Sequence, residues 1–141
     1  MKIAIITDTH WGVRNDNAAF MDNSKKFLDD VFFPYIDSNG IDTCLHLGDL
    51  VDRRKYININ TARRLREDFL QPLTDRALDV YIIAGNHDTY YKNTNEVNSL
   101  DLLLKEYHNI NVVNEPTEVM FEDKKFMIVP WICQENEERC M

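Results

Sequence analysis

Three short polar clusters contain the side chains that could do chemistry. They are Asp8-Thr9-His10-Trp11-Gly12, Gly48-Asp49-Leu50-Val51-Asp52 and Gly85-Asn86-His87-Asp88. Together they offer carboxylates, an asparagine amide and imidazoles but no thiolate, which is a mixed oxygen and nitrogen donor set. Such a set suits manganese, iron or a mixed two-metal site better than a structural zinc site. A carboxylate that bridges two cations, such as that of Asp49, would relieve the repulsion between neighbouring carboxylates.

Each cluster taken alone has a simpler interpretation. An Asp-x-His sequence often arises by chance, Gly-Asp-x-x-Asp is usually a turn or a helix cap, and Asp88 can be a cap. All three clusters occur in order, however, and each directly follows an apolar strand pattern. This conjunction favours a metal site over three unrelated turns.

Apolar, β-branched runs precede the three clusters and predict buried strands at residues 2–7, 43–47 and 80–84. Apolar residues at helical spacing predict helices over 16–36, 61–73 and 99–107. We expect Pro34 to end or kink the first helix, Asn39-Gly40 to close it, and Asn60 to cap the second. This alternation predicts an α/β fold with a parallel sheet, whose strand ends bring the clusters together. Gly48 and Gly85 would allow the chain to turn tightly there.

The rest of the chain is richer in strands. The pattern predicts a strand at 111–113 and a hairpin formed by 118–121 and 125–129 around the polar turn 122–124. Residues 134–141 are polar and are followed by no further element. The length of 141 residues fits one domain.

The composition is that of a soluble globular protein. The net charge of −8 makes nucleic acid a poor guess on charge alone, although a carboxylate metal site would account for part of it. Cys44, Cys133 and Cys140 match no zinc spacing and are expected to be free thiols. No signal peptide or apolar run of membrane-spanning length is visible, so we expect a cytoplasmic protein without a membrane partner.

On the three clusters and their strands, the chain resembles the calcineurin-like metallophosphoesterase family. The resemblance implies a β-sandwich flanked by helices and a centre with two Mn²⁺ or other divalent cations. It assigns Asp8 and His10 to the first metal, Asp49 to both metals and Asn86 to the second. It also implies that His87 is the catalytic acid or stabilises the leaving oxygen, and that Asp52 holds and polarises that histidine.

Within this family, the SbcD-type nuclease subunit of the double-strand-break repair complex is the most similar branch. The resemblance rests on Asp-Thr-His-Trp-Gly, Gly-Asp-Leu-Val-Asp-Arg and Ile128-Val129-Pro130-Trp131. It implies a manganese-dependent DNA nuclease that hydrolyses phosphodiesters in DNA repair and recombination. It also implies an SbcC-like SMC-type ATPase as partner, and a homodimer formed through helices of this half.

The chain departs from the family after the third cluster. The family's later motifs, a lone ligand histidine and a Gly-His-x-His pair, have no match here. His46 lies inside a predicted strand, so we expect a core histidine with satisfied hydrogen bonds. His108 lies at a predicted helix end, so we expect it to be exposed. We therefore expect residues 1–141 to be the N-terminal portion of a nuclease domain, lacking the C-terminal ligand motifs and inactive alone.

Basic and aromatic residues near the second and third clusters are candidate DNA contacts. They are Arg53, Arg54, Lys55, Tyr90, Tyr91 and Lys92. Arg63, Arg64 and Arg66 extend the basic run but equally fit a solvated helix face paired with Glu67 and Asp68. Two other functions stay open. One is a related phosphoesterase acting on nucleotides or phosphoproteins; the other is a non-catalytic dimerisation or docking module that uses helices 16–36 and 61–73.

Overall fold

A four-stranded parallel sheet forms the centre of the molecule in the computed structural model, which describes residues 1–53, 55–86, 88 and 99–141. The strand order is β1-β2-β3-β4. The strands are β1 (Ile3–Ile6), β2 (Thr43–His46), β3 (Asp79–Ile83) and β4 (Ile110–Val113). The register aligns Ile6 with His46 and His46 with Ile82, so the first three strands end side by side. The predicted α/β fold and parallel sheet are confirmed.

The predicted burial is right for β2 and wrong for β1. Every residue of β2 is buried, whereas Ile5 of β1 keeps 61% of its surface exposed. The reason is position, because β1 lies at the edge and pairs only with β2 among the described strands. An apolar run in the sequence does not distinguish a central strand from an edge strand.

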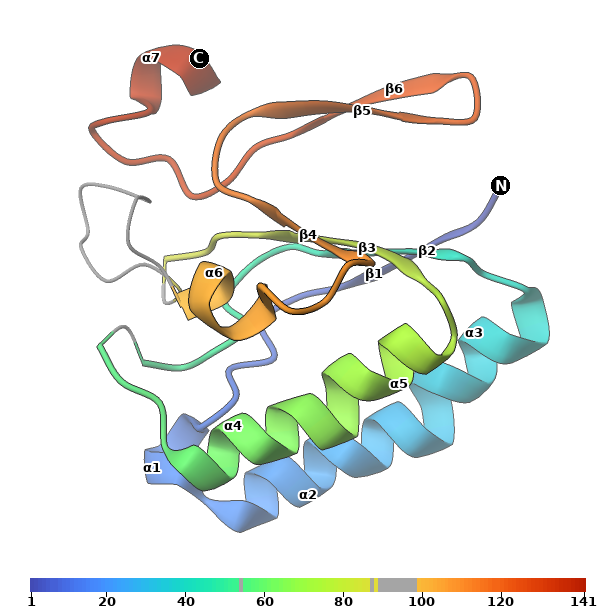
Figure 1. The fold of residues 1–141 in the computed structure, drawn as a ribbon, viewed down its shortest axis with the longest axis vertical. Helices are drawn as coiled ribbons and strands as arrows, with labels where there is room; N and C mark the ends of the chain where they lie inside the picture. Colours follow the sequence, from blue (N-terminus) through green and yellow to red (C-terminus); the bar gives the residue numbers. More distant parts are fainter. Residues whose placement is uncertain (54, 87, 89–98) are drawn as a thin grey trace.

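Helices cover one face of the sheet, and a hairpin covers the other (Figure 1). The helical layer comprises α2 (Ala18–Phe27), α3 (Phe33–Asn39), α4 (Ile59–Leu65) and α5 (Gln71–Asp75). The hairpin is formed by β5 (Thr117–Phe121) and β6 (Lys124–Ile128), which confirms the predicted antiparallel pair. Shorter elements are α1 (Val13–Asp16), α6 (Ser99–Leu104) and α7 (Glu137–Cys140).

Both long helices cross a proline through a π-helical turn. The segments Leu28–Phe32 and Arg66–Leu70 are π-helical and lie just before Pro34 and Pro72. In a regular helix, a proline ring clashes with the carbonyl four residues earlier, and a wider preceding turn relieves that clash. Pro34 therefore distorts the first helix without ending it, and the helix continues to Asn39.

The helix ends agree with the sequence at one cap and differ at another. Gly40 closes α3 in the left-handed conformation at φ 59°, as predicted. The cap of α4 is Asn58 and not Asn60, because the Asn58 side chain accepts hydrogen bonds from the N–H groups of Asn60 and Thr61. The helix begins earlier than the apolar pattern indicated, since Ile59 and Asn60 form an exposed first turn.

The larger hydrophobic core lies between the helices and the sheet, and includes Leu65, Phe69, Leu73, Val80 and Ile82. The smaller one lies under the hairpin and consists of Leu45, Val113, Phe121 and Ile128. Each fully buried side chain of this kind contributes about 1.5–3 kcal/mol to folding, so most of the stabilisation comes from the helical face. Among the described residues, no helix is long and apolar enough to span a membrane, and the three cysteines are free thiols.

Candidate metal centre

Backbone hydrogen bonds join the loops that follow β1 and β2. The Asp8 N–H donates to the Gly48 carbonyl at 3.1 Å, and the His10 N–H donates to the Asp49 carbonyl at 3.0 Å. The pairing of the two parallel strands thus continues past the end of the sheet. As a result, the first cluster is held against the second by bonds that do not depend on side-chain type.

The residues of these loops adopt an unusual backbone conformation. Asp8, His10 and Asp49 have φ angles of 52°, 42° and 53°, and Gly48 has a φ of 105°. The left-handed region costs a non-glycine residue about 1–2 kcal/mol. Such conformations persist where the surrounding structure enforces them, and they concentrate at functional sites.

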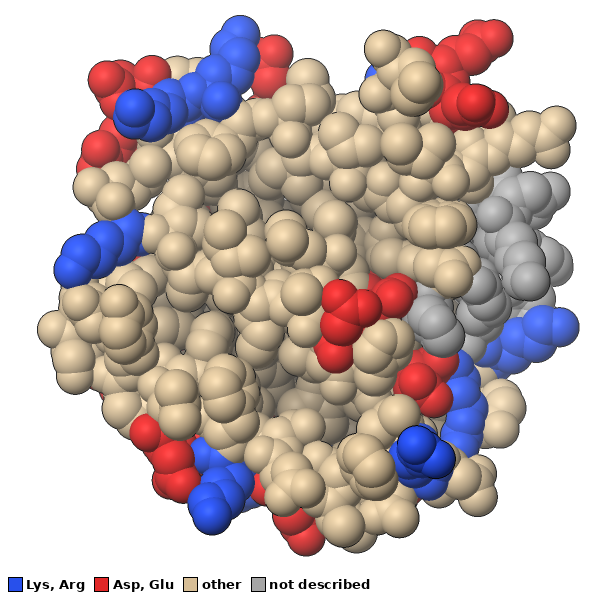
Figure 2. Space-filling model, turned by 180° about the vertical axis from the view of Figure 1, so that it is seen from behind, with Lys and Arg blue, Asp and Glu red and all other residues tan. Residues whose placement is uncertain are grey.

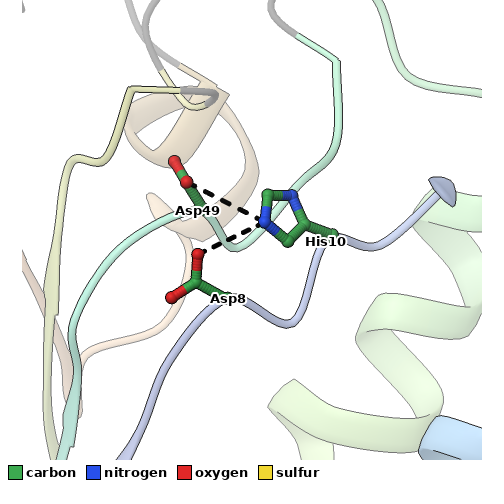
Figure 3. Close-up of side chains that lie close together, drawn as sticks. All are labelled: Asp8, His10 and Asp49. Atoms are coloured by element: carbon green, nitrogen blue, oxygen red, sulfur yellow. Dashed lines mark ion pairs between the residues drawn. The ribbon is translucent and has the colours of Figure 1, made fainter.

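Asp8, His10 and Asp49 point toward one another (Figure 3). His10 Nε2 lies 3.3 Å from Asp8 Oδ1 and 3.9 Å from Asp49 Oδ2. One ligand atom from each residue lies within 4.8 Å of the other two. Two carboxylate oxygens and an imidazole nitrogen at this spacing fit a divalent cation such as manganese or iron. The structure brings these three predicted residues together, and their role as ligands stays a prediction.

Asp52 contacts the other ring nitrogen of His10. Its Oδ1 atom lies 3.4 Å from His10 Nδ1. A carboxylate in this position orients an imidazole and favours the tautomer that leaves Nε2 available to a cation. His87, which the sequence analysis predicts as the partner of Asp52, lies outside the described residues.

The loops after β2 and β3 meet through two glycines. Gly48 needs its φ of 105°, which confirms the turn predicted there. Gly85 needs space instead, because a Cβ atom at this position would lie 2.3 Å from the Asp49 backbone nitrogen and 2.4 Å from Asp49 Oδ1. Only a residue without a side chain allows this approach, which keeps the third cluster close to Asp49.

Asp88 links the second and third clusters from inside the protein. Its side chain is fully buried; Oδ1 accepts from the Val51 N–H at 3.2 Å and Oδ2 from the Gly85 N–H at 2.9 Å. Burial raises the pKa of this carboxyl to about 6. Sequence reasoning considered Asp88 only as a helix cap and missed this link between two loops.

A cleft of about 530 Å³ opens beside Asp49. Asn86, the predicted ligand of the second metal, lines this cleft together with Asp49. The lining also includes Trp131, whose backbone N–H donates to the Ala84 carbonyl at 2.8 Å. The cleft therefore combines polar ligand candidates with apolar walls, as small-molecule sites commonly do.

The two remaining described histidines differ in environment. His46 is fully buried, and burial lowers its pKa to about 4. Its Nδ1 atom accepts from the Gly48 N–H at 3.2 Å, and Nε2 lies 3.0 Å from the Thr9 hydroxyl. His108 is exposed. The predictions of a satisfied core histidine and a surface histidine are both confirmed.

The electrostatics around the cluster favour a cation. The Thr7 hydroxyl donates to Asp8 Oδ2 at 2.6 Å, and this hydrogen bond lowers the pKa of Asp8. Figure 2 shows that most of this face of the molecule carries no charged side chains. An ionised carboxylate in such surroundings attracts a positive ion.

The candidate DNA contacts are only partly described. The Arg53 guanidinium donates to Asp16 Oδ2 at 2.6 Å and to Asn15 Oδ1 at 2.9 Å. Lys55 is exposed. The other candidates, Arg54, Tyr90, Tyr91 and Lys92, lie outside the described residues.

The basic residues of the second long helix are paired with acidic ones. Arg63 donates to Glu67 at 2.8 Å, and Arg64 donates to Asp68 at 3.0 Å. The exposed Arg63–Glu67 pair confirms the alternative interpretation of a solvated, charge-paired helix face for Arg63. Arg64 is paired but largely buried, and it also donates to Asp22 of α2 at 2.7 Å, so the solvated-face interpretation is wrong for this residue. Arg66 pairs instead with Glu106.

Comparison with known proteins identifies a family and two similar proteins. Residues 1–130 match the family model of the calcineurin-like phosphoesterases. The chain is 36% identical over 140 residues to "Exonuclease subunit 1" of Enterobacteria phage T4, and the alignment covers 96% of this chain and 40% of that relative. The chain thus spans less than half the length of that relative. A solved structure of Pseudomonas putida nuclease MPE aligns with a TM-score of 0.45 and 20% identity, over 85% of this chain and 50% of the other.

Proposed function

Because the chain belongs to the calcineurin-like phosphoesterase family, we propose that it forms part of a manganese-dependent DNA nuclease subunit that hydrolyses phosphodiester bonds. The observation that carries the proposal is the convergence of Asp8, His10 and Asp49 at the ends of two parallel strands. The identity with a phage protein named as an exonuclease subunit supports DNA as the substrate.

The donor atoms of these side chains fit the cations proposed. Asp8 and His10 would hold the first cation, Asp49 would hold both, and Asn86, which shares a cleft with Asp49, would hold the second. When bound, divalent cations in such centres act as Lewis acids that stabilise negative charge on a phosphate. The absence of thiolates from this set supports manganese over a structural zinc ion.

The protein's own groups would orient the substrate and move the proton. His87 would donate a proton to the departing sugar oxygen, with Asp52 as its orienting carboxylate. The contact of Asp52 with His10 Nδ1 adds a second role for Asp52, which is to fix the ring that carries a proposed ligand.

The subunit context is also a proposal. We place the chain in a cytoplasmic DNA repair or recombination complex with an SbcC-like SMC-type ATPase. Support comes from the relative's name, which describes one subunit. Residues 1–141 would be the N-terminal portion of the nuclease domain, and the remaining ligands would come from a further segment. The 40% coverage of the relative supports this.

The proposed DNA-contacting residues closely follow the second and third clusters in the sequence. Arg53, Arg54 and Lys55 follow the second cluster and would hold phosphates, while Tyr90, Tyr91 and Lys92 follow the third and would contact unpaired bases. The bonds of Arg53 to Asp16 and Asn15 show that its guanidinium already has acidic and amide partners. A DNA phosphate would add to these partners or compete with them.

A homodimer is supported by the outer face of the first long helix. Phe20, Phe27, Val31 and Tyr35 recur there at helical spacing, and all four are exposed. A row of exposed aromatic and aliphatic side chains is typical of a protein contact surface. Light scattering that finds only monomer at high protein concentration would contradict the homodimer.

Calorimetry with Mn²⁺ tests the metal centre. Asp49→Asn should abolish or strongly weaken binding, because an amide is neutral and cannot neutralise two cations. Asp123→Asn is the matched control, since it removes the same charge from the exposed tip of the hairpin and should bind as the unaltered protein does. Equal binding by both variants would contradict the proposed centre.

A parallel assay separates nuclease from general phosphoesterase. A longer protein that includes residues 1–141 and the further segment is offered single-stranded and duplex DNA and a small phosphodiester such as bis-p-nitrophenyl phosphate. Hydrolysis of DNA supports the nuclease; hydrolysis of the small ester without DNA cleavage would favour a phosphoesterase acting on nucleotides or phosphoproteins.

A further inference from the structure

His46 lies behind the proposed ligands and has no part in the function proposed above. It is the last residue of β2 and is fully buried. Its ring meets Phe69 edge-on, with the centroids 6.1 Å apart. Both ring nitrogens lie within hydrogen-bond distance of the loops that carry the ligands.

The partners of the imidazole determine which nitrogen carries the proton. The Gly48 N–H can only donate, so Nδ1 of His46 must accept. The proton is therefore on Nε2, which donates to the Thr9 hydroxyl, and that hydroxyl donates in turn to the Leu50 carbonyl at 3.2 Å. The lowered pKa of His46 agrees with a neutral ring that keeps this single tautomer.

The bond to Thr9 acts on the first ligand loop. Thr9 is the residue between Asp8 and His10, both of which have left-handed backbones. The Thr9 side chain points inward to His46 while its two neighbours present their side chains to each other. Anchoring Thr9 therefore limits how far either neighbour can rotate.

The bonds to Gly48 and Leu50 act on the second ligand loop. Gly48 precedes Asp49 and Leu50 follows it. The imidazole holds the N–H of the first directly, and the Thr9 hydroxyl holds the carbonyl of the second. One buried ring is thus connected to the sequence neighbours of three of the proposed ligands, Asp8, His10 and Asp49.

We propose that His46 is a positioning residue that fixes the two ligand loops and thereby sets the arrangement of the metal-binding side chains. The proposal rests on the metal centre proposed above. Groups that orient ligands from a second layer typically change metal affinity by one to two orders of magnitude when they are lost. This role is distinct from that of Asp52, because His46 acts on backbone and not on a ligand ring.

Thr9→Val tests the link with little change in shape. The variant removes the hydroxyl between His46 and Leu50 while keeping a side chain of similar volume. Thr74→Val is the matched control, because the Thr74 hydroxyl also is partly buried and its single proton is shared between the Leu70 carbonyl and Asn109 Oδ1, both at 3.0 Å. We expect Thr9→Val to weaken Mn²⁺ binding about tenfold and Thr74→Val to leave it unchanged.

His46→Asn and His46→Gln divide the two bonds of the ring. An asparagine amide oxygen can take the place of Nδ1 and keep the bond from Gly48, whereas a glutamine amide nitrogen can reach Thr9 in place of Nε2. Each variant should retain part of the Mn²⁺ affinity, and His46→Phe should retain the least. Equal Mn²⁺ affinity in all three and in the unaltered protein would overturn the proposal.

A metal-free measurement separates this proposal from the proposed function. In ¹⁵N spectra of the unaltered protein, His46 should be a neutral ring protonated on Nε2. Thr9→Val should shift the amides of Gly48 and Asp49, which lie in the second ligand loop and far from Thr9 in sequence, and Thr74→Val should not. Failure of the proposed function would appear as absent Mn²⁺ binding by the unaltered protein. Failure of the present proposal would appear as amides of Gly48 and Asp49 that do not move in Thr9→Val.

Discussion

The two junctions at the carboxyl end of the sheet are built differently. Loops after β1 and β2 are joined by backbone hydrogen bonds, such as those from Asp8 to Gly48 and from His10 to Asp49. Loops after β2 and β3 are joined by the side chain of Asp88 and by the contact that Gly85 permits. The bonds of the first junction are made by backbone groups, whereas the second depends on the identity of two residues, Gly85 and Asp88.

This difference indicates where substitutions will act. A backbone bond survives most substitutions, so the first junction should respond chiefly to loss of the His46 ring that supports it. The second junction should fail when a single methyl group or a single oxygen is changed. The following predictions test that contrast, from the largest expected effect to the smallest.

Gly85→Ala should have the largest effect. Its new Cβ would lie 2.3 Å from the Asp49 backbone nitrogen, so one of the two loops must move. We expect a loss of about 3 kcal/mol or more in the free energy of unfolding. Urea denaturation measures it, with Gly40→Ala as control, because no atom lies within 4 Å of a Cβ there. The control should lose only about 1 kcal/mol from its positive φ. Equal losses would contradict the role given to Gly85.

His46 should make the first junction sensitive to acid. The pKa of His46 is 6.5 in the unfolded chain and about 4 in the folded protein. Between pH 6.5 and pH 4, therefore, the unfolded chain binds a proton that the folded protein does not. The free energy of unfolding should therefore fall by about 3 kcal/mol as the pH drops from 6.5 to 4, relative to His46→Phe. Denaturation at several pH values gives this difference. A difference that does not change with pH would refute a buried neutral ring.

Asp88 should give the second junction the opposite dependence. Its pKa is raised from 3.8 to about 6 by burial, so the folded protein binds the additional proton in that range. The contribution of Asp88 to the free energy of unfolding therefore falls as the pH rises from 3.8 to 6. Asp88→Asn should remove this dependence and cost about 1–3 kcal/mol, because the amide nitrogen cannot accept from a backbone N–H. Asp75→Asn, at an exposed helix end, is the control and should change stability little.

Trp11→Phe should have the smallest effect. The Trp11 ring is buried and stacks on Phe69 with centroids 6.5 Å apart, and its Nε1 has no hydrogen-bond partner among the described residues. Phenylalanine loses some packing but also removes a buried donor, so the two effects oppose each other. Stability should change by about 1 kcal/mol or less. A loss as large as that of Gly85→Ala would mean that the indole nitrogen has an important partner.

The sequence predicted the sheet and the convergence of Asp8, His10 and Asp49, because apolar runs and strand ends obey simple rules of parallel sheets. It did not predict the exposure of Ile5, since an edge position depends on the whole strand order. Asn58 was missed as a cap because the helix begins with an exposed turn that has no apolar pattern.

The connections behind the site were harder to predict. His46 was correctly expected in the core, but its two partners come from loops 37 and 2 residues away in the sequence. The link made by Asp88 likewise joins backbone groups 37 and 3 residues away. The two bonds that span 37 residues depend on the tertiary structure, about which local patterns carry no information. The role of Gly85 was predicted as backbone freedom, whereas the structure shows a need for space.

The left-handed backbones of Asp8, His10 and Asp49 have a consequence for how this sequence can change over time. Glycine would occupy these conformations without backbone strain. The aspartates and the histidine therefore make the folded protein less stable than glycine would at the same positions. Selection for thermal stability alone would therefore drive these positions toward glycine and remove the ligands. A laboratory evolution experiment that rewards only folding should lose the metal-binding side chains early, while one that also rewards metal binding should keep them.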